Sequence, residues 1–276
     1  MVPRSPVCRY ASILVSVDAT PICEGRIKLA VDLSRRFEGR LIGCAAQPIV
    51  APLYFEAVGT GVATFTEIEE LRVADDLAKA KGRFLHIAGE CDEVEWRQNV
   101  GRITDFVVQQ AREADIVIAS RPSENENLSP ELDVDAEDLL MRAGRPILFV
   151  PPGIDHLSAD RIVIGWSDTR EARRAIADSM PLLLRASEVT VLAIGNENSG
   201  ASNVASYLAC HGVAVLAVEQ NSPDGPAEEL VRFAHAHGAD LIVCGGYGHS
   251  RMREWVLSGV TLNLLDQTTL CCLMTH

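Results

Sequence analysis

The 276-residue sequence predicts an α/β protein made of two tandem, doubly wound parallel-sheet domains. Two observations predict this fold class. Several short apolar runs lack polar alternation, which is typical of strands covered by helices on both faces. These runs alternate with stretches of helical length, and the whole pattern occurs twice, which indicates an internal duplication.

The duplication is clearest at the start of each copy. Residues 13–20 (ILVSVDAT) and 162–169 (IVIGWSDT) both read as a buried strand that ends in a polar turn, at an offset of 149 residues. The elements that follow keep this offset: we expect helices at 24–37 and 170–184 and second strands at 41–46 and 190–195.

The later parts of the two copies match at an offset of 125, so the first copy holds 24 extra residues. We expect fourth strands at 114–119 and 239–244, and fifth strands at 145–150 and 270–274. We place most of the extra residues in a long excursion over 47–66, rich in Pro, Gly and aromatic residues, before a helix near 67–81.

A boundary between the copies is predicted at residues 151–158 (PPGIDHLS), because two prolines and a glycine end the preceding strand and suit an exposed linker. We therefore expect domains at 1–152 and 153–276.

The composition excludes several classes of function. With a net charge of −13, the chain does not suit broad contact with nucleic acid or an anionic membrane. Its apolar runs are shorter than the roughly 20 residues of a spanning helix. Eight cysteines without a C-x-x-C pair predict reduced, buried thiols in a cytoplasmic protein. The second half contains no lysine, which excludes a Walker-type phosphate lysine there.

A glycine-rich turn is the main candidate site, because ligands of open α/β sheets bind beyond the carboxyl ends of the strands where strand order reverses. In the second copy, the fourth strand runs into a turn and then a helix over 251–265. Backbone N–H groups and the helix N-terminus could cradle a phosphate, with Ser250, Arg251 and Arg253 as side-chain donors. The alternative is that the glycines serve only a tight turn. The turn reads Gly245-Gly246-Tyr247-Gly248-His249-Ser250.

The equivalent turn of the first copy, residues 119–126 (ASRPSENE), has no glycine. Its proline removes one N–H donor and its two glutamates would repel phosphates. We therefore expect an anion site in the second copy and none in the first.

These residues resemble the universal stress protein family in its tandem form. Gly245 and Gly248 fit the family pattern G-x-x-G, and nine residues separate them from Ser258-Gly259, where the family has Gly-Ser or Gly-Thr. Gly259-Val260-Thr261 matches a Gly-Val-Thr found in many tandem members. The resemblance implies strand order 3-2-1-4-5 in each copy, and a pseudo-dimer packed through 147–150 and 271–275.

The resemblance also implies a stress-response regulator that binds ATP or another adenine nucleotide, with Mg²⁺, mainly in the second domain. A family aspartate closing the first strand is matched by Asp18 in the first copy, whereas the second copy has Ser167 followed by Asp168. The implied binding residues of the second domain are Gly245, Gly246, Gly248, His249, Ser250, Arg251, Ser258, Gly259, Val260, Thr261, Ser167 and Asp168.

Two other functions stay open: a nucleotide-free interaction and dimerisation module of the same family, and a slow ATPase. The sequence contains no nucleophile elbow, zinc-protease motif or P-loop, so we expect a binding protein rather than an enzyme and predict no metal-ligand cluster. The expected partners are a small-molecule nucleotide and a second copy or the chain's own other half.

The remaining candidates have simpler interpretations. His235 and His237 stand two apart in a helix and do not share a face, so we interpret them as surface residues near a helix C-terminus. Cys271 and Cys272 are adjacent in a strand and point to opposite faces, which leaves open a redox pair of one of them with Cys244. Core or interface positions are expected for Trp166 and Trp255, and a solvated loop and first helical turn for the acidic residues 124–138.

Overall fold

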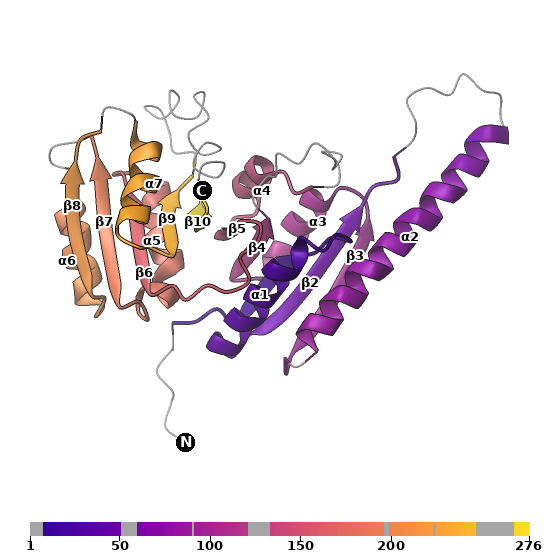
Figure 1. Ribbon diagram of the computed structural model, residues 1–276, viewed down its shortest axis with the longest axis horizontal. Helices are drawn as coiled ribbons and strands as arrows, with labels where there is room; N and C mark the ends of the chain where they lie inside the picture. Colours follow the sequence, from indigo (N-terminus) through magenta and orange to yellow (C-terminus); the bar gives the residue numbers. More distant parts are fainter. Residues whose placement is uncertain are drawn as a thin grey trace.

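The computed structural model describes residues 8–50, 60–89, 91–120, 133–195, 199–222, 225–246 and 268–276. Its strands form one ten-stranded sheet with helices on both faces (Figure 1). This architecture confirms the predicted α/β fold class.

The first half of the chain contributes five strands. In order, the elements are β1 Ser12–Ser16, α1 Cys23–Phe37, β2 Arg40–Gln47, α2 Thr60–Ala88, β3 Val94–Val100, α3 Ile103–Gln110, the 3₁₀ turn η1 Ala111–Glu113, β4 Ile116–Ser120, α4 Ala136–Arg142 and β5 Ile147–Val150.

The second half repeats this order. Its elements are β6 Arg161–Trp166, α5 Arg170–Leu183, β7 Glu188–Ile194, α6 Ala201–Cys210, β8 Val215–Gln220, α7 Pro226–Ala236, β9 Leu241–Gly245 and β10 Cys271–Thr275.

The strand order is β3-β2-β1-β4-β5-β10-β9-β6-β7-β8. Each half therefore has the order 3-2-1-4-5 that the resemblance implied, with parallel neighbours throughout. The two halves meet where β10 pairs with β5 in antiparallel register, with Leu273 opposite Leu148. The final strands thus join the halves as expected.

The extra residues lie after β2, as expected, but the excursion expected over 47–66 is shorter because a helix begins inside it. Helix α2 has 29 residues and begins at Thr60, inside the predicted excursion, whereas its counterpart α6 has 10. Most of the additional length of the first half is therefore helical. The helix was missed because Pro, Gly and aromatic residues upstream of Glu67 suggested a loop.

The predicted alignment of the second strands was wrong by one residue. Ile13 of β1 pairs with Leu41, and Ile162, its equivalent in β6, pairs with Val189 rather than Thr190. Since side chains alternate between faces, a shift of one residue exchanges the two faces of the strand. Gly195 accordingly lies just after β7, with a positive φ of 82°.

Local signals explain several helix ends. The Thr169 hydroxyl accepts a hydrogen bond from the Ala172 N–H and caps α5, and the Asp135 carboxylate accepts one from Asp138 and caps α4. The described part of the acidic stretch thus forms a first helical turn, as expected. His235 and His237 are exposed at the C-terminal end of α7, which confirms their interpretation as surface residues.

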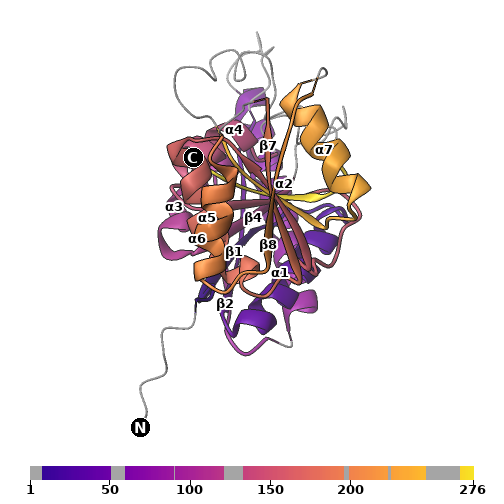
Figure 2. The ribbon, with the colours of Figure 1, turned by 90° about the vertical axis from the view of Figure 1, so that its left-hand side faces the viewer.

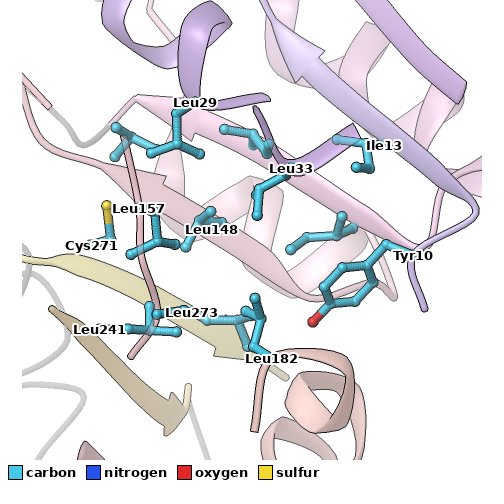
Figure 3. Packing of buried hydrophobic residues seen from close by; sticks show 14 of the residues in the cluster. Tyr10, Ile13, Leu29, Leu33, Leu148, Leu157, Leu182, Leu241, Cys271 and Leu273 are labelled. Carbon is cyan, nitrogen blue, oxygen red and sulfur yellow. The ribbon is translucent and has the colours of Figure 1, made fainter. Parts of the chain in front are cut away.

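A continuous hydrophobic core crosses the junction between the halves (Figure 3). Leu148 of β5 and Leu273 of β10 pack with Tyr10, which precedes β1, and Leu182 of α5. Polar contacts also link the halves: the Tyr10 hydroxyl donates to the Asp178 carbonyl at 2.8 Å.

A second set of contacts ties α1 to the second half. Arg36 donates to the carbonyl oxygen of Leu157 at 2.6 Å. Arg185 donates to the carbonyl of Arg36 at 3.1 Å, and its guanidinium carbon lies 4.7 Å from the centroid of the Phe37 ring. Within the described ranges, no helix is long and apolar enough to cross a bilayer.

The shared core predicts that a truncation in β10 destabilises the whole chain. Leu273 is fully buried, so Leu273→Ala should lower the free energy of unfolding by about 3 kcal/mol, through lost burial and a residual cavity. Urea unfolding followed by circular dichroism measures this change. Leu71 of α2 is 73% exposed, so the control Leu71→Ala should change it by less than about 0.5 kcal/mol. Equal costs for the two variants would contradict a core shared through β10.

Candidate functional site

Strand order reverses at two places in the sheet, between β1 and β4 and between β6 and β9. The turns that follow these strands are the expected ligand positions of such sheets. The two places have different side chains, as the sequence predicted.

In the first half, an aspartate–arginine pair fills the position after β1. The Asp18 carboxylate accepts a hydrogen bond from Arg26 Nη2 at 3.0 Å and another from the Thr20 N–H at 2.7 Å. Arg26 is only 5% exposed and also donates through Nε to the Ser16 carbonyl at 2.7 Å. The oxygens of Asp18 are thus engaged by the protein itself.

A second carboxylate lies after β4. The Ser120 hydroxyl donates to Asp133 Oδ1 at 3.3 Å, and burial raises the pKa of the Asp133 carboxyl group. Asp18 acts in the same direction on this pKa, whereas Arg26 opposes it. Carboxylates therefore gather around one arginine here, an arrangement that disfavours a phosphate ligand.

In the second half, the described residues hold no equivalent aspartate–arginine pair at the corresponding position. The offset of 149 places Ala175 where the first half has Arg26, so the buried cation is missing. Ser167 and Asp168 follow β6, and the exposed Asp168 carboxylate forms a close ion pair with Arg173 of α5. Both side chains of this pair are exposed at the surface.

Gly245 and Gly246 have steric reasons to be glycine. A Cβ on Gly245 would lie 2.5 Å from the Ala172 nitrogen and 2.7 Å from the Glu171 carbonyl carbon, in the first turn of α5. A Cβ on Gly246 would lie 2.5 Å from Cδ2 of Leu140, in α4 of the first half. The tight-packing alternative therefore accounts for these two glycines.

The rest of the predicted cradle lies outside the described residues and stays a prediction. This applies to Gly248, His249, Ser250, Arg251, Ser258, Gly259, Val260 and Thr261, and also to Arg253 and Trp255.

A cleft of about 480 Å³ lies beyond the carboxyl ends of β6 and β7, between α5 and α6. Trp166 is mostly buried at its base, as expected of a core residue, and its indole N–H donates to the Ser199 carbonyl at 2.9 Å. Polar and aromatic groups of both helices and of the turn after β6 line it. They include Asp168, Arg173, Asn203 and Tyr207.

Sequence reasoning missed this cleft. Tyr207 and Asn203 lie on a short helix with no motif, and only their position beside the end of β6 gives them a common site. The residue that could have signalled it is Trp166, a large aromatic residue at the carboxyl end of a strand.

A further cavity of about 380 Å³ lies among α1, the end of α2 and the linker between the halves. Its carboxylates have partners within the protein: Arg36 Nη2 donates to the Asp32 carboxylate at 3.3 Å, His156 Nδ1 lies 2.9 Å from the same carboxylate, and Lys28 lies 4.0 Å from the Asp155 carboxylate. In the part of the chain that the structure describes, no group of three His, Cys, Asp or Glu side chains could hold a metal ion.

The buried cysteines Cys244 and Cys271 are poor nucleophiles. Cys271 and Cys272 belong to the cores on opposite faces of the sheet, as predicted, and Cys244 shares a core with Cys272. Burial raises the pKa of the Cys244 and Cys271 thiols to about 12, so both stay protonated at neutral pH. This argues against a reactive redox pair.

The glycine packing predicts different costs for two adjacent substitutions. Gly245→Ala should lower the free energy of unfolding by about 2 kcal/mol, because the new Cβ meets backbone atoms of α5 that cannot rotate away. Gly246→Ala should cost less than about 1 kcal/mol, because the Leu140 side chain can adopt another rotamer. Urea denaturation measures both, and a larger cost for Gly246→Ala would refute this packing argument.

Thiol reactivity should follow burial. In the native protein near pH 8, iodoacetamide should modify the exposed Cys210 and leave Cys244 and Cys271 unmodified, since their raised pKa values leave almost no thiolate. Peptide mass spectrometry after labelling reads out each site. Labelling in urea is the control, in which all three cysteines should react; native labelling of Cys244 at the rate of Cys210 would contradict the assigned burial.

No protein-family model matches the sequence, and no curated protein matches it. Solved structures do match its fold. A universal stress protein from Archaeoglobus fulgidus DSM 4304 is 10% identical, with a TM-score of 0.70 over 96% of this chain and 95% of that one. A protein of unknown function from Pseudomonas aeruginosa PAO1 is 13% identical, with a TM-score of 0.56 over 96% and 92% of the two chains.

A universal stress protein in complex with cAMP matches 51% of this chain and 97% of its own length at 17% identity. Its TM-score of 0.32 is too low for that ligand to bear on this chain. The full-length likeness and the strand order agree with the resemblance read from the sequence. Over nearly its whole length, the chain has the universal stress protein fold.

Proposed function

We propose that this chain acts as a tandem universal stress protein, with domains at 1–152 and 153–276. In this proposal it is a regulatory binding protein of the stress response that takes ATP or another adenine nucleotide mainly in the second domain. The observation that carries the proposal is the cleft between α5 and α6, at the carboxyl ends of β6 and β7.

The cleft suits a nucleobase in size and chemistry. Ligand sites of small molecules commonly occupy about 300–1,000 Å³ and combine apolar walls with a few polar groups. Trp166 and Tyr207 supply aromatic surface, and the Asn203 amide can both donate and accept hydrogen bonds. Arg173 supplies a cation at the rim.

The position of β6 links this cleft to the glycine turn. β6 pairs with β7 on one side and with β9 on the other, so the cleft and the turn after Gly246 follow adjacent strands. We place the base in the cleft and the phosphates at the turn. Since the second half has no lysine, phosphate donors there would be backbone N–H groups, Ser250 and Arg251.

The first half supports this choice of domain by contrast. Arg26 engages Asp18, and Asp133 lies nearby, so the equivalent position already holds a cation with its carboxylates. We therefore expect no nucleotide there.

Titration calorimetry with Mg-ATP tests the proposal. Arg173→Ala should weaken binding by about tenfold, because it removes one charge-assisted contact at the cleft. Arg174→Ala is the matched control, since it removes the same charge from an exposed position of the same helix that does not line the cleft. Its affinity should equal that of the unmodified protein.

Absence of binding at millimolar Mg-ATP would overturn the proposal and favour the nucleotide-free interaction module. The observation that favours this module is that close packing alone explains why Gly245 and Gly246 are glycine. Mass spectrometry of small molecules released from protein purified without nucleotide distinguishes the two. The third function, a slow ATPase, would be supported only if the unmodified protein released phosphate from ATP faster than a Gly248→Val variant does.

A further inference from the structure

The outer edge of β8 is unusually open. Figure 2 views the molecule from this end, with α6 and α7 on opposite faces of the sheet. α7 packs on β7, so the β8 side chains on that face have little cover and Leu216 is 62% exposed. Among the described residues, β8 is the last strand of the sheet and no strand pairs with its outer side.

The opposite edge, β3, is protected. Glu95 and Arg97 pair with Ile42 and Cys44 of β2, and thus occupy the positions that Leu216 and Val218 occupy in the second half. Arg97 forms ion pairs at 2.8 Å with both Glu95 and Glu113. Charges on an edge strand prevent pairing with another chain, and β8 carries only Glu219.

The hydrogen bonds to β7 show which backbone groups of β8 face outward. The Val189 N–H donates to the Ala214 carbonyl at 2.9 Å, and the Gly195 N–H donates to the Gln220 carbonyl at 2.9 Å. Residues of even number therefore face β7. Because strand groups alternate, the N–H and C=O groups of Val215, Ala217 and Glu219 point out of the sheet.

We propose that two copies of this chain pair through β8 in antiparallel fashion, with Ala217 on the two-fold axis. Val215 of one copy then lies opposite Glu219 of the other, and the outward groups form about six backbone hydrogen bonds. Leu216 lies opposite Val218 in a pair without hydrogen bonds, where side chains approach most closely. The exposed apolar face of one β8 thus covers that of its copy.

Geometry and charge select this register. A two-fold axis perpendicular to the sheet requires opposite residues to share a face, so it must pass through a residue. Centring on Ala217 pairs the three outward residues of β8 with one another, whereas centring on Leu216 or Val218 would set one of them opposite a residue outside the strand. Centring on Glu219 would put two carboxylates opposite each other, whereas centring on Ala217 separates them. Each copy has a net charge of −13, and the resulting repulsion disfavours contact through surfaces rich in carboxylates. β8 is a surface with few carboxylates.

Sedimentation equilibrium of the full chain at micromolar concentration tests the proposal. The unmodified protein should be a dimer, and added salt should tighten it by screening the net charges. Ala217→Pro should raise the dimer dissociation constant at least about tenfold, since proline removes an outward N–H that the fold does not use. Leu216→Glu places a carboxylate at the position where the protected edge strand β3 has one, and it should raise the dimer dissociation constant by a similar factor.

Gln98→Pro in β3 is the matched control. The Leu41 N–H donates to the Glu93 carbonyl and the Gly101 N–H to the Gln47 carbonyl, so the N–H of Gln98 also points outward, at the other edge. This variant should dimerise like the unmodified protein. Circular dichroism must show that each variant is natively folded. If Ala217→Pro is not folded, the dissociation constant of Leu216→Glu tests the proposal instead.

A monomer at every concentration would overturn the proposal, as would a dimer that both β8 variants leave intact. A monomer that instead takes up an extended peptide along β8 would also overturn it, because the edge would then serve another kind of partner.

Discussion

The antiparallel pairing of β5 with β10 is the contact on which the rest of the structure depends. Each half is a parallel sheet with an open side at its fifth strand, and this pairing closes both open sides against each other. Tyr10, Phe149, Leu182 and Leu273 are thereby buried, and hydrogen bonds such as that from Tyr10 to the Asp178 carbonyl cross between the halves. Among the described strands, only β3 and β8 remain as edges of the sheet, so further pairing of these strands must involve one of the two.

The same pairing fixes where the two halves can differ without loss of the fold. The switch points, between β1 and β4 and between β6 and β9, lie outside the β5–β10 pairing itself. At one, buried Arg26 holds Asp18. At the other, Ala175 replaces the arginine and a solvent-accessible cleft lies beside Trp166. The two halves thus share one fold but differ at these points, with an ion pair at the first and a cleft beside the second.

Continuous apolar runs and the repeat offsets were sufficient to predict the first, second, fourth and fifth strands of each half, because both are properties of the chain itself. The order of the strands and the junction came from the resemblance to the universal stress protein family. The length of α2 was missed because Pro, Gly and aromatic residues suggested a loop where a helix begins at Thr60. The one-residue change at Val189 was invisible because Val189 and Thr190 both suit a strand, and only pairing with Ile162 decides between them. The cleft depends on how far apart α5 and α6 lie, which no local pattern encodes.

The difference in length between α2 and α6 connects these features. In Figure 1, α2 runs along the whole β3 edge, and it packs on α1 as well as on β2 and β3. α6 has 10 residues against 29, and it packs on β7 and β8. A short helix cannot fill the space beside α5, which leaves the cleft lined by Arg173 and Tyr207. The second half therefore has both the cleft and the unprotected edge strand. The first half has both the switch point occupied by an ion pair and the protected edge strand. Ligand binding and self-association would consequently be functions of the same half of the chain, on opposite sides of β7.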